Sequence, residues 1–269
     1  MAETDFARLA PPRGATLAIV GACGGIGRAV TQAAIGIGLK VAALDLPRSL
    51  KESPPPDGVV LSAALDATDE AQVKSAFARV NKAFGGRLDG LVNLAGFANR
   101  HVGFDELSPA EWQETLDGSL KTTYLACRAA LPLLKASARA GGSPAIVNIS
   151  SGLGVRVRPG FAPYSAAKAA VVAFTKVIAH EAAPAIRANV IAPGAVDTAF
   201  HEGGTGRVPD ASNSRPRIDR AAYALQTPAG RMAVAEDMVG PILFLLGPGA
   251  GFISGQVLHV NGAGLMPGA

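Results

Sequence analysis

The feature that most constrains the fold of this chain is a series of seven short apolar runs with strand character, separated by segments with helical character. The runs occupy residues 16–20, 40–46, 59–65, 88–94, 145–149, 186–192 and 256–260. Each run is almost continuously apolar, which is typical of strands buried on both faces of a parallel sheet. The helical segments cover residues 25–37, 69–84, 108–137, 164–183 and 236–246. This order predicts an α/β, Rossmann-type doubly wound parallel sheet of about seven strands, with helices on both faces.

Capping and breaking residues refine this prediction. Candidate N-caps of the helix near residue 69 are Asp66, Thr68 and Asp69. Ser108, followed by a proline and with Glu111 three residues later, predicts a capping box. Residues 47–57 contain too many prolines for a full helix, so we expect a short crossover there.

The chain shows no internal repeat and no linker that would divide it. We therefore expect residues 1–269 to form one domain, with an N-terminal tail at 1–13. Residues 195–230 are rich in Gly, Pro, Ser and Arg, and a connection this long inside a compact domain is usually functional. We interpret this segment as a substrate lid; a surface insertion without a role is the alternative.

The composition bears on possible partners. Apolar residues make up 49% of the chain, whereas only 17% are charged, which fits an oligomer that hides part of its surface. The net charge of +4 comes from scattered basic residues, and the densest stretch, around Arg215 and Arg220, is interrupted by proline and aspartate. Nucleic-acid binders usually cluster their charge, so we expect no nucleic-acid partner.

The cysteines and the N-terminus indicate where the protein works. Cys23 and Cys127 lie far apart and form no metal-ligand pattern, so we expect a reducing compartment and no metal. The start of the chain lacks the basic and apolar regions of a secretory signal, and no apolar run approaches membrane-spanning length. We therefore expect a cytoplasmic protein without a membrane partner.

A glycine-rich turn joins the first strand to the first helix. Gly21, Gly25 and Gly27 let the backbone turn tightly and let a pyrophosphate approach the helix N-terminus, where free N–H groups favour an anion. The spacing differs from the usual dinucleotide fingerprint, but the position at a strand–helix junction favours dinucleotide binding over a plain tight turn.

Asp45 ends the second strand, 18 residues after Gly27. A carboxylate there can accept hydrogen bonds from ribose hydroxyls and repel a ribose phosphate, which favours NAD over NADP. Arg48 lies close enough in sequence to weaken this preference, and an ordinary strand-end turn residue is the alternative reading of Asp45.

Tyr164 and Lys168 share one helix face because they are four residues apart. A cation beside a phenol favours the phenolate and brings its pKa toward a useful range for proton transfer. Ser151 follows a strand at the carboxyl edge of the sheet, where its hydroxyl could bond a substrate oxygen. Ser150 is the adjacent competitor for that role.

Together these residues resemble the short-chain dehydrogenase/reductase family in its single-domain form, from about residue 14 to 264. The matching segments are GACGGIG at 21–27, DATD at 66–69, NLAG at 93–96, ISS at 149–151, YSAAK at 164–168 and PGAVDT at 193–198, followed by ISGQVLHVNG at 253–262.

The resemblance implies catalytic roles for Ser151, which orients the substrate oxygen, Tyr164, which exchanges its proton, and Lys168, which lowers the tyrosine pKa and holds the ribose. The cofactor residues that it implies, besides Tyr164 and Lys168, are Gly21, Gly25, Ile26, Gly27, Asp45, Leu46, Asp66, Ala67, Asn93, Ala95, Gly96, Pro193, Gly194, Val196 and Thr198. It also implies a homo-oligomer, as a tetramer or dimer.

Four positions depart from the family pattern. Val20 replaces a threonine before the first glycine, Leu94 replaces the second asparagine of NNAG, and Asn261 stands where aspartate is commoner. Ser119 stands where the family usually has an asparagine that holds a water linking the lysine to solvent. Because serine is shorter, we hypothesise an active enzyme with a weakened proton relay.

The leading interpretation is an NAD-dependent alcohol dehydrogenase or ketone reductase of this family. An NAD-binding regulatory or weakly active protein is the alternative suggested by Ser119, and an epimerase or dehydratase on the same scaffold is less favoured. The substrate is an alcohol or ketone, and an anionic one is a further hypothesis. Its candidate binding residues are Arg100, His101, Arg156, Arg158 and the lid arginines.

Overall fold

The computed structural model describes residues 9–98, 101–202 and 218–265, and its centre is one seven-stranded sheet. The strand order is β3-β2-β1-β4-β5-β6-β7, and every pairing is parallel. The strands are β1 (Thr16–Val20), β2 (Lys40–Asp45), β3 (Leu61–Ala64), β4 (Gly90–Asn93), β5 (Ala145–Ile149), β6 (Arg187–Pro193) and β7 (Val257–Val260). The predicted doubly wound sheet is confirmed, and its order reverses between β1 and β4, where such sheets bind ligands.

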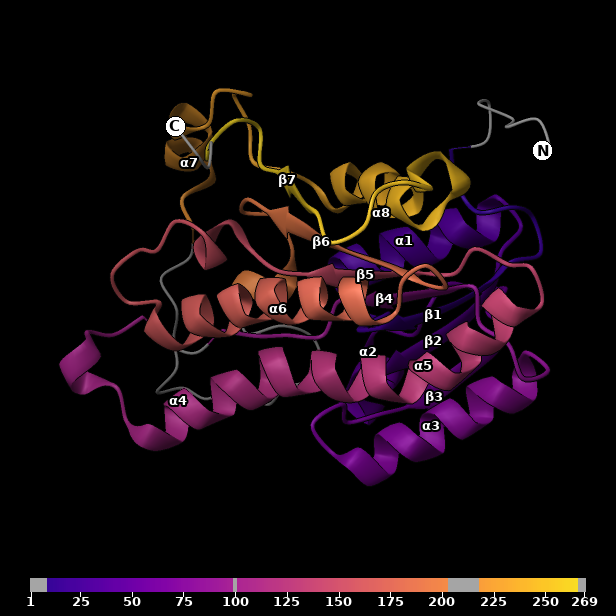
Figure 1. The fold of residues 1–269 in the computed structure, drawn as a ribbon. Helices are drawn as coiled ribbons and strands as arrows, with labels where there is room; N and C mark the ends of the chain where they lie inside the picture. Colours follow the sequence, from indigo (N-terminus) through magenta and orange to yellow (C-terminus); the bar gives the residue numbers. More distant parts are fainter. Residues whose placement is uncertain (1–8, 99–100, 203–217, 266–269) are drawn as a thin grey trace.

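Helices cover both faces of the sheet (Figure 1). Residues of α3, α5 and α6 pack in the core on one face, and residues of α1 and α8 pack on the other. The helices are α1 (Gly25–Gly36), α2 (Pro47–Glu52), α3 (Glu70–Ala83), α4 (Pro109–Leu116), α5 (Thr122–Arg139), α6 (Ala162–Glu181), α7 (Arg220–Gln226) and α8 (Val239–Leu246).

The apolar runs are continuous because both faces of each central strand are buried. In β1, Ala18 and Val20 lie in the core beneath α3 and α5, whereas Leu17 and Ile19 lie in the core beneath α1 and α8. Successive side chains of a strand point to opposite faces, so a strand covered on both sides needs apolar residues at every position.

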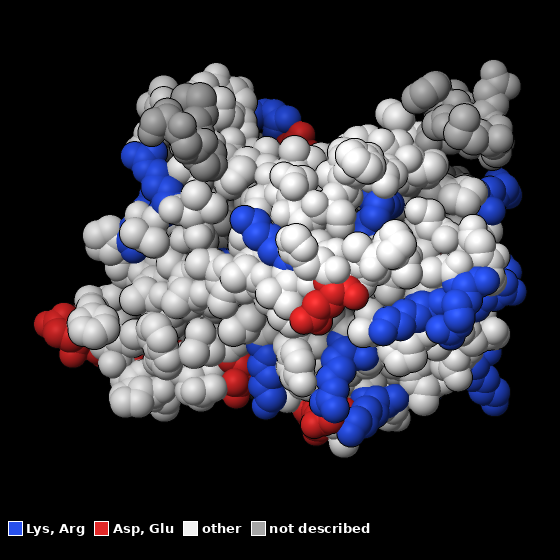
Figure 2. Space-filling model, in the orientation of Figure 1, with Lys and Arg blue, Asp and Glu red and all other residues white. Residues whose placement is uncertain are grey.

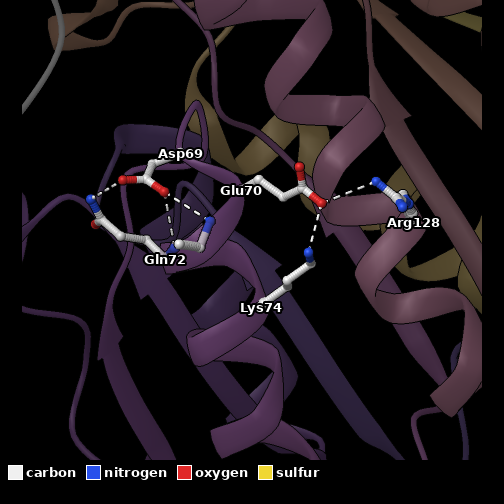
Figure 3. A network of polar contacts seen from close by, with 6 residues as sticks. Asp69, Glu70, Gln72, Lys74 and Arg128 are labelled. Atoms are coloured by element: carbon white, nitrogen blue, oxygen red, sulfur yellow. Dashed lines mark hydrogen bonds and ion pairs between the residues drawn. The ribbon is translucent and has the colours of Figure 1, made fainter.

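Asp69 is the N-cap of α3. Its carboxylate accepts hydrogen bonds from the backbone N–H groups of Ala71 at 2.8 Å and Gln72 at 3.2 Å (Figure 3). Asp66, another candidate cap, instead accepts from the backbone N–H of Thr68 at 2.9 Å, in the turn before the helix. The first turn of α3 therefore begins where the sequence predicts, and Asp66 remains at the edge of the sheet.

A second set of contacts in Figure 3 joins α3 to α5. The Glu70 carboxylate pairs with Lys74 at 2.8 Å and with Arg128 of α5 at 3.2 Å. All three side chains are exposed, so this network adds little to the free energy of unfolding.

The prediction of a single helix over 108–137 is wrong in one respect, because a π-helical turn interrupts the helix. The predicted capping box of Ser108 and Glu111 does open α4. A π-helical turn, Asp117–Lys121, then separates α4 from α5. Gly118 in this turn lies so close to the ring of Phe97 that a Cβ would fall 1.9 Å from a ring carbon. Such turns are rare and are often found at functional sites.

The crossover at 47–57 and the predicted lid at 195–230 agree in part with the sequence-based predictions. The crossover after β2 is short, as predicted, since α2 has only 6 residues and begins with a proline. Within the predicted lid, the structure describes a 3-10 turn (Ala199–Glu202) and helix α7. The part of the lid at 203–217 lies outside the described residues, as do residues 1–8 of the predicted tail.

Charged side chains occupy a limited part of the face drawn in Figure 2. Basic and acidic side chains are interspersed over the region of α3 and α5, and much of the remaining face carries neither. Among the residues that the structure describes, no helix has the length and apolar character needed to cross a bilayer.

Candidate active site

A cavity of about 1170 Å³ opens at the carboxyl ends of the central strands. Nearly all of the sequence-predicted site residues line it: Gly21, Gly25, Ile26, Gly27, Asp45, Leu46, Asp66, Ala67, Ala95, Gly96, Ser151, Tyr164, Lys168, Pro193, Gly194, Val196 and Thr198. Asn93 and Ser119 are not among the lining residues. Residues far apart in the sequence therefore meet at one cavity, at the switch point of the sheet.

The glycine turn is packed so closely that side chains would not fit. A Cβ on Gly27 would lie 2.0 Å from the carbonyl oxygen of Gly21, and one on Gly25 would lie 2.5 Å from the methyl carbon of Thr198. Gly21 has a positive φ of 85°, where side chains are disfavoured. Helix α1 begins here without a side-chain cap, so its first N–H groups are left to bind an anion.

The carboxylate of Asp45 is held at the end of β2 by two backbone N–H groups. Those of Cys23 and Leu46 each donate to it at 2.7 Å. Burial and the neighbouring Asp45 raise the pKa of the Cys23 thiol to about 12, so this thiol stays protonated. Arg48, which weakened the NAD prediction, pairs with Glu52 at 2.7 Å and does not line the cavity.

Lys168 lies buried beside Tyr164 on α6. Only 3% of its surface is exposed, and its Nζ donates to the carbonyl oxygen of Ile149 at 2.9 Å. The same Nζ is 5.6 Å from the centroid of the Tyr164 ring. Burial lowers the pKa of Lys168 to about 8, because the charged form loses its hydration. The predicted phenol–ammonium pair is thus close together at the cavity wall.

The two adjacent serines have different surroundings. The Ser150 hydroxyl donates to the backbone carbonyl of Lys168 at 2.7 Å and so anchors α6. The Ser151 oxygen accepts from the backbone N–H of Leu153 at 3.2 Å, which leaves its proton for a ligand in the cavity. This difference favours Ser151 over Ser150 as the group that contacts substrate.

Ser119 lies behind the cavity, in the π-helical turn. It is fully buried, and its hydroxyl donates to the carbonyl oxygen of Phe97 at 3.0 Å. A Cβ placed on Gly96 would lie 3.5 Å from the Ser119 oxygen and 3.1 Å from the Nζ of Lys168. The serine hydroxyl and the ammonium therefore both approach the backbone at Gly96.

Asn93 also points away from the cavity. Its Nδ2 donates to the Oδ1 of Asn148 on β5 at 2.6 Å and to the sulfur of Cys127 at 3.3 Å. The contact with a cofactor ribose that the family resemblance implies for Asn93 is therefore not evident in this geometry, and it stays a prediction. The two apolar replacements noted in the sequence, Val20 and Leu94, do line the cavity.

The described parts of the predicted lid contact the cavity directly. The Tyr223 hydroxyl of α7 accepts from the backbone N–H of Ala195 at 2.9 Å. Arg220 forms a two-bond ion pair with Asp197, at 2.8 and 2.7 Å. The ring of Phe200 lies 5.9 Å from that of Tyr164. Tyr223 and Phe200 were not predicted from the sequence; for Tyr223 the available signal was Asp219, which caps α7.

Charged groups of both signs surround the mouth of the cavity. Arg156, Arg158 and His101 line it, as do the acids Glu114 and Asp117. The His101 ring contacts Phe161 in a tilted arrangement, with ring centroids 3.9 Å apart and an interplanar angle of 53°. Arg100, Arg215 and Arg217 lie outside the described residues. Within the described ranges, no three His, Cys, Asp or Glu side chains gather as a metal site.

Known proteins resemble this chain over most of its length. The family model described as enoyl-(acyl carrier protein) reductase matches residues 21–264. The 3-oxoacyl-(acyl-carrier-protein) reductase FabG of Salmonella typhimurium is 29% identical over 249 residues, which cover 91% of this chain and 94% of that protein. The cis-4-hydroxycyclohexanecarboxylate dehydrogenase of Sinomonas cyclohexanicum is 34% identical over 252 residues, with the same coverage of 91% and 94%.

Solved structures share the fold. A 3-ketoacyl-(acyl-carrier-protein) reductase from Brucella melitensis, complexed with NADH, superposes with a TM-score of 0.83 at 28% identity. The match covers 94% of this chain and 99% of that one. The aldohexose dehydrogenase of Thermoplasma acidophilum, in ligand-free form, superposes with a TM-score of 0.79, also at 28% identity, over 93% of each chain.

Proposed function

Because the chain belongs to the short-chain dehydrogenase/reductase family, we propose that it transfers a hydride between an alcohol or ketone substrate and NAD. The observation that carries this proposal is the convergence of Ser151, Tyr164 and Lys168 on the same cavity as the glycine turn. A bound nicotinamide would supply the hydride acceptor or donor, and the uncapped N-terminus of α1 fits its pyrophosphate.

The side chains have distinct tasks in this proposal. The free proton of Ser151 bonds the substrate oxygen and holds it near the phenol of Tyr164. In reduction, Tyr164 gives its proton to the carbonyl oxygen as hydride reaches the carbon; in oxidation, it takes the proton from the alcohol. Lys168 favours the phenolate as a neighbouring cation, and the protons that its bond to Ile149 leaves free can bind the ribose.

The preference for NAD rests on the charges at the adenosine end of the cavity. Asp45 and Asp66 line that end, whereas the only Lys and Arg among the described lining residues are Arg156, Arg158 and Lys168, at the substrate end. A ribose phosphate would thus meet a carboxylate and no cation among these residues.

The proposed reaction is tested by a screen of alcohols and hydroxy acids against NAD and NADP. We expect NADH to form with at least one secondary alcohol, and little NADPH with the same substrate. Absence of turnover with every substrate and both cofactors, from a folded protein that binds NADH, would support the alternative of a regulatory NAD-binding protein.

The hydrogen bond of Ser119 favours the alternative of a regulatory protein, because its hydroxyl already donates to the carbonyl oxygen of Phe97. We propose instead a working enzyme whose relay from Lys168 to solvent is weakened. The variant Ser119→Asn should therefore raise turnover, and unchanged or lower turnover would count against the weakened relay.

We further propose that the substrate is an anion, bound by Arg156 and Arg158. Arg156 and Arg158 line the cavity and form no ion pair with any residue that the structure describes. One relative is named for a hydroxycyclohexane carboxylate. Changing both arginines to methionine should raise KM for acidic substrates selectively; an equal change for neutral substrates would remove this part of the proposal.

We also propose a cytoplasmic homo-oligomer, either a tetramer or a dimer. Its support is the exposure of large apolar side chains on α5, α6 and the loop before β7, including Tyr124, Val177 and Phe252. Both cysteines are buried free thiols, as a reducing compartment favours. Light scattering should give a mass of two or four chains, and a monomer at micromolar concentration would contradict the oligomer.

A further inference from the structure

A chain of neutral polar side chains runs through the core directly behind the cavity. It joins Asn93 at the end of β4, Asn148 of β5 and Thr175 of α6. Asn148 and Thr175 are completely buried. Burying amide and hydroxyl groups costs free energy unless they are paired, so such a chain in a central sheet calls for an explanation.

The hydrogen bonds fix the orientation of each group. Asn93 and Asn148 are opposite one another on paired strands, and the Nδ2 of Asn93 donates to the Oδ1 of Asn148 at 2.6 Å. Because the Oδ1 of Asn148 accepts this bond, its Nδ2 lies on the other side and donates to the hydroxyl oxygen of Thr175 at 2.9 Å. The Thr175 hydroxyl in turn donates a hydrogen bond to the carbonyl oxygen of Val171, at 2.7 Å.

Thr175 lies on the same stripe of α6 as the two predicted catalytic residues. The buried side chains of this stripe are Tyr164, Lys168, Val171, Thr175 and Ala179. Their spacing of three or four residues places them along one side of the helix, toward the sheet. A rotation or slide of α6 that breaks the bond at Thr175 therefore also moves Tyr164 and Lys168.

The remaining contacts of α6 with the core are mainly apolar, and they include the partly buried Phe174 and Ile178. The other buried residues in the body of the helix are small, chiefly Ala167, Val171 and Ala179. Apolar packing is non-directional, whereas a hydrogen bond is directional. Among the described residues, the directional bonds between the β5 segment and α6 are those of Asn148 to Thr175, of Ser150 to the Lys168 carbonyl, and of the Lys168 ammonium to the Ile149 carbonyl.

We infer that Asn148 and Thr175 are positioning residues, which hold α6 on β5 so that Tyr164 and Lys168 face the substrate oxygen. This inference rests on the proposed function, since it concerns the same reaction. Neither residue lines the cavity, so their effect is transmitted through the setting of α6.

The test compares three threonine variants of the full chain. Thr175→Val keeps the shape of the side chain and removes the hydroxyl, and Thr175→Ser restores it. Thr115→Val is the matched control, because Thr115 is also completely buried and bonds a backbone carbonyl in α4, but has no bond to a strand.

We expect Thr175→Val to lower kcat by at least about tenfold, since small displacements of reacting groups have large effects on rate. KM for NAD should change less, because other elements hold the adenosine and pyrophosphate. Thr175→Ser should recover wild-type kcat, and Thr115→Val should keep it. Wild-type kcat in Thr175→Val, no recovery in Thr175→Ser, or an equal loss in Thr115→Val would overturn the inference.

A crystal structure of Thr175→Val separates this inference from the proposed function. We expect its Tyr164 hydroxyl to be displaced relative to Ser151, whether or not the wild-type protein turns over. An unmoved Tyr164 would overturn the inference and leave the proposed function standing. A displaced Tyr164 together with a wild-type protein without turnover would instead remove the proposed function and leave only the structural role of Thr175.

Discussion

At the scale of single residues, the candidate site is built from groups held in costly states. Lys168 is a buried cation whose one hydrogen bond to a group in the described ranges is to the Ile149 carbonyl. Asp45 is a buried carboxylate held by two backbone N–H groups. Burying such charges costs free energy, and both groups can form hydrogen bonds with the hydroxyls of a bound ribose.

We expect Lys168→Met to stabilise the cofactor-free protein at neutral pH. Burial lowers the pKa of Lys168 from 10.5 to about 8, so keeping it charged costs on the order of 3 kcal/mol. Between pH 8 and pH 10.5, Lys168 is protonated in the unfolded chain but largely neutral in the folded one. The free energy of unfolding therefore rises with pH across this window. Urea denaturation should show the variant's advantage at pH 7 shrinking by pH 10; a constant difference would contradict the burial argument.

We expect Asp45 to set the cofactor preference. The double variant Asp45→Ser, Leu46→Arg removes the carboxylate and adds a cation at the end of β2. Its kcat/KM should rise by at least about tenfold for NADP and fall for NAD, because a ribose phosphate is no longer repelled. Steady-state kinetics with both cofactors measures this, and an unchanged ratio of the two kcat/KM values would show that selection lies elsewhere.

At the scale of elements, α1 and α6 supply two parts of the candidate site at the edge of the sheet. Helix α1 begins in the glycine turn, and α6 bears Tyr164 and Lys168. The close approach of α1 depends on Gly27, which touches the backbone of the turn. The setting of α6 depends on bonds from β5 to Thr175 and to the Lys168 carbonyl. The helix of the proposed pyrophosphate site is thus placed by the absence of side chains, and the helix of the proposed acid–base pair by polar contacts.

Gly27→Ala should disturb α1. The added Cβ would lie 2.0 Å from the Gly21 carbonyl oxygen, so the turn must shift. We expect the free energy of unfolding to fall by about 1–3 kcal/mol and NADH binding to weaken. Gly36→Ala in the same helix meets nothing within 4 Å and is the control, expected to raise stability by up to about 1 kcal/mol. Equal effects of the two variants on NADH binding would contradict this role of Gly27.

At the scale of the whole molecule, the sheet and its helices follow from the sequence because burial on both faces demands continuous apolar strands. Three features did not follow. The π-helical turn at Ser119 adds one residue without disturbing the apolar pattern. The inward orientation of Asn93 depends on Asn148, a partner distant in the sequence. Helix α7 is too short for periodicity to reveal it, so Tyr223 was missed.

In the proposed reaction, the Tyr164 phenol transfers the proton in a cavity that binds NAD without needing this hydroxyl. The most direct measurement is kcat of Tyr164→Phe, taken together with its affinity for NADH. We expect kcat to fall by about 10²–10⁴-fold while the Kd for NADH stays close to that of the wild type, since only the proton donor is removed. A folded Tyr164→Phe that binds NADH and retains wild-type turnover would contradict the account.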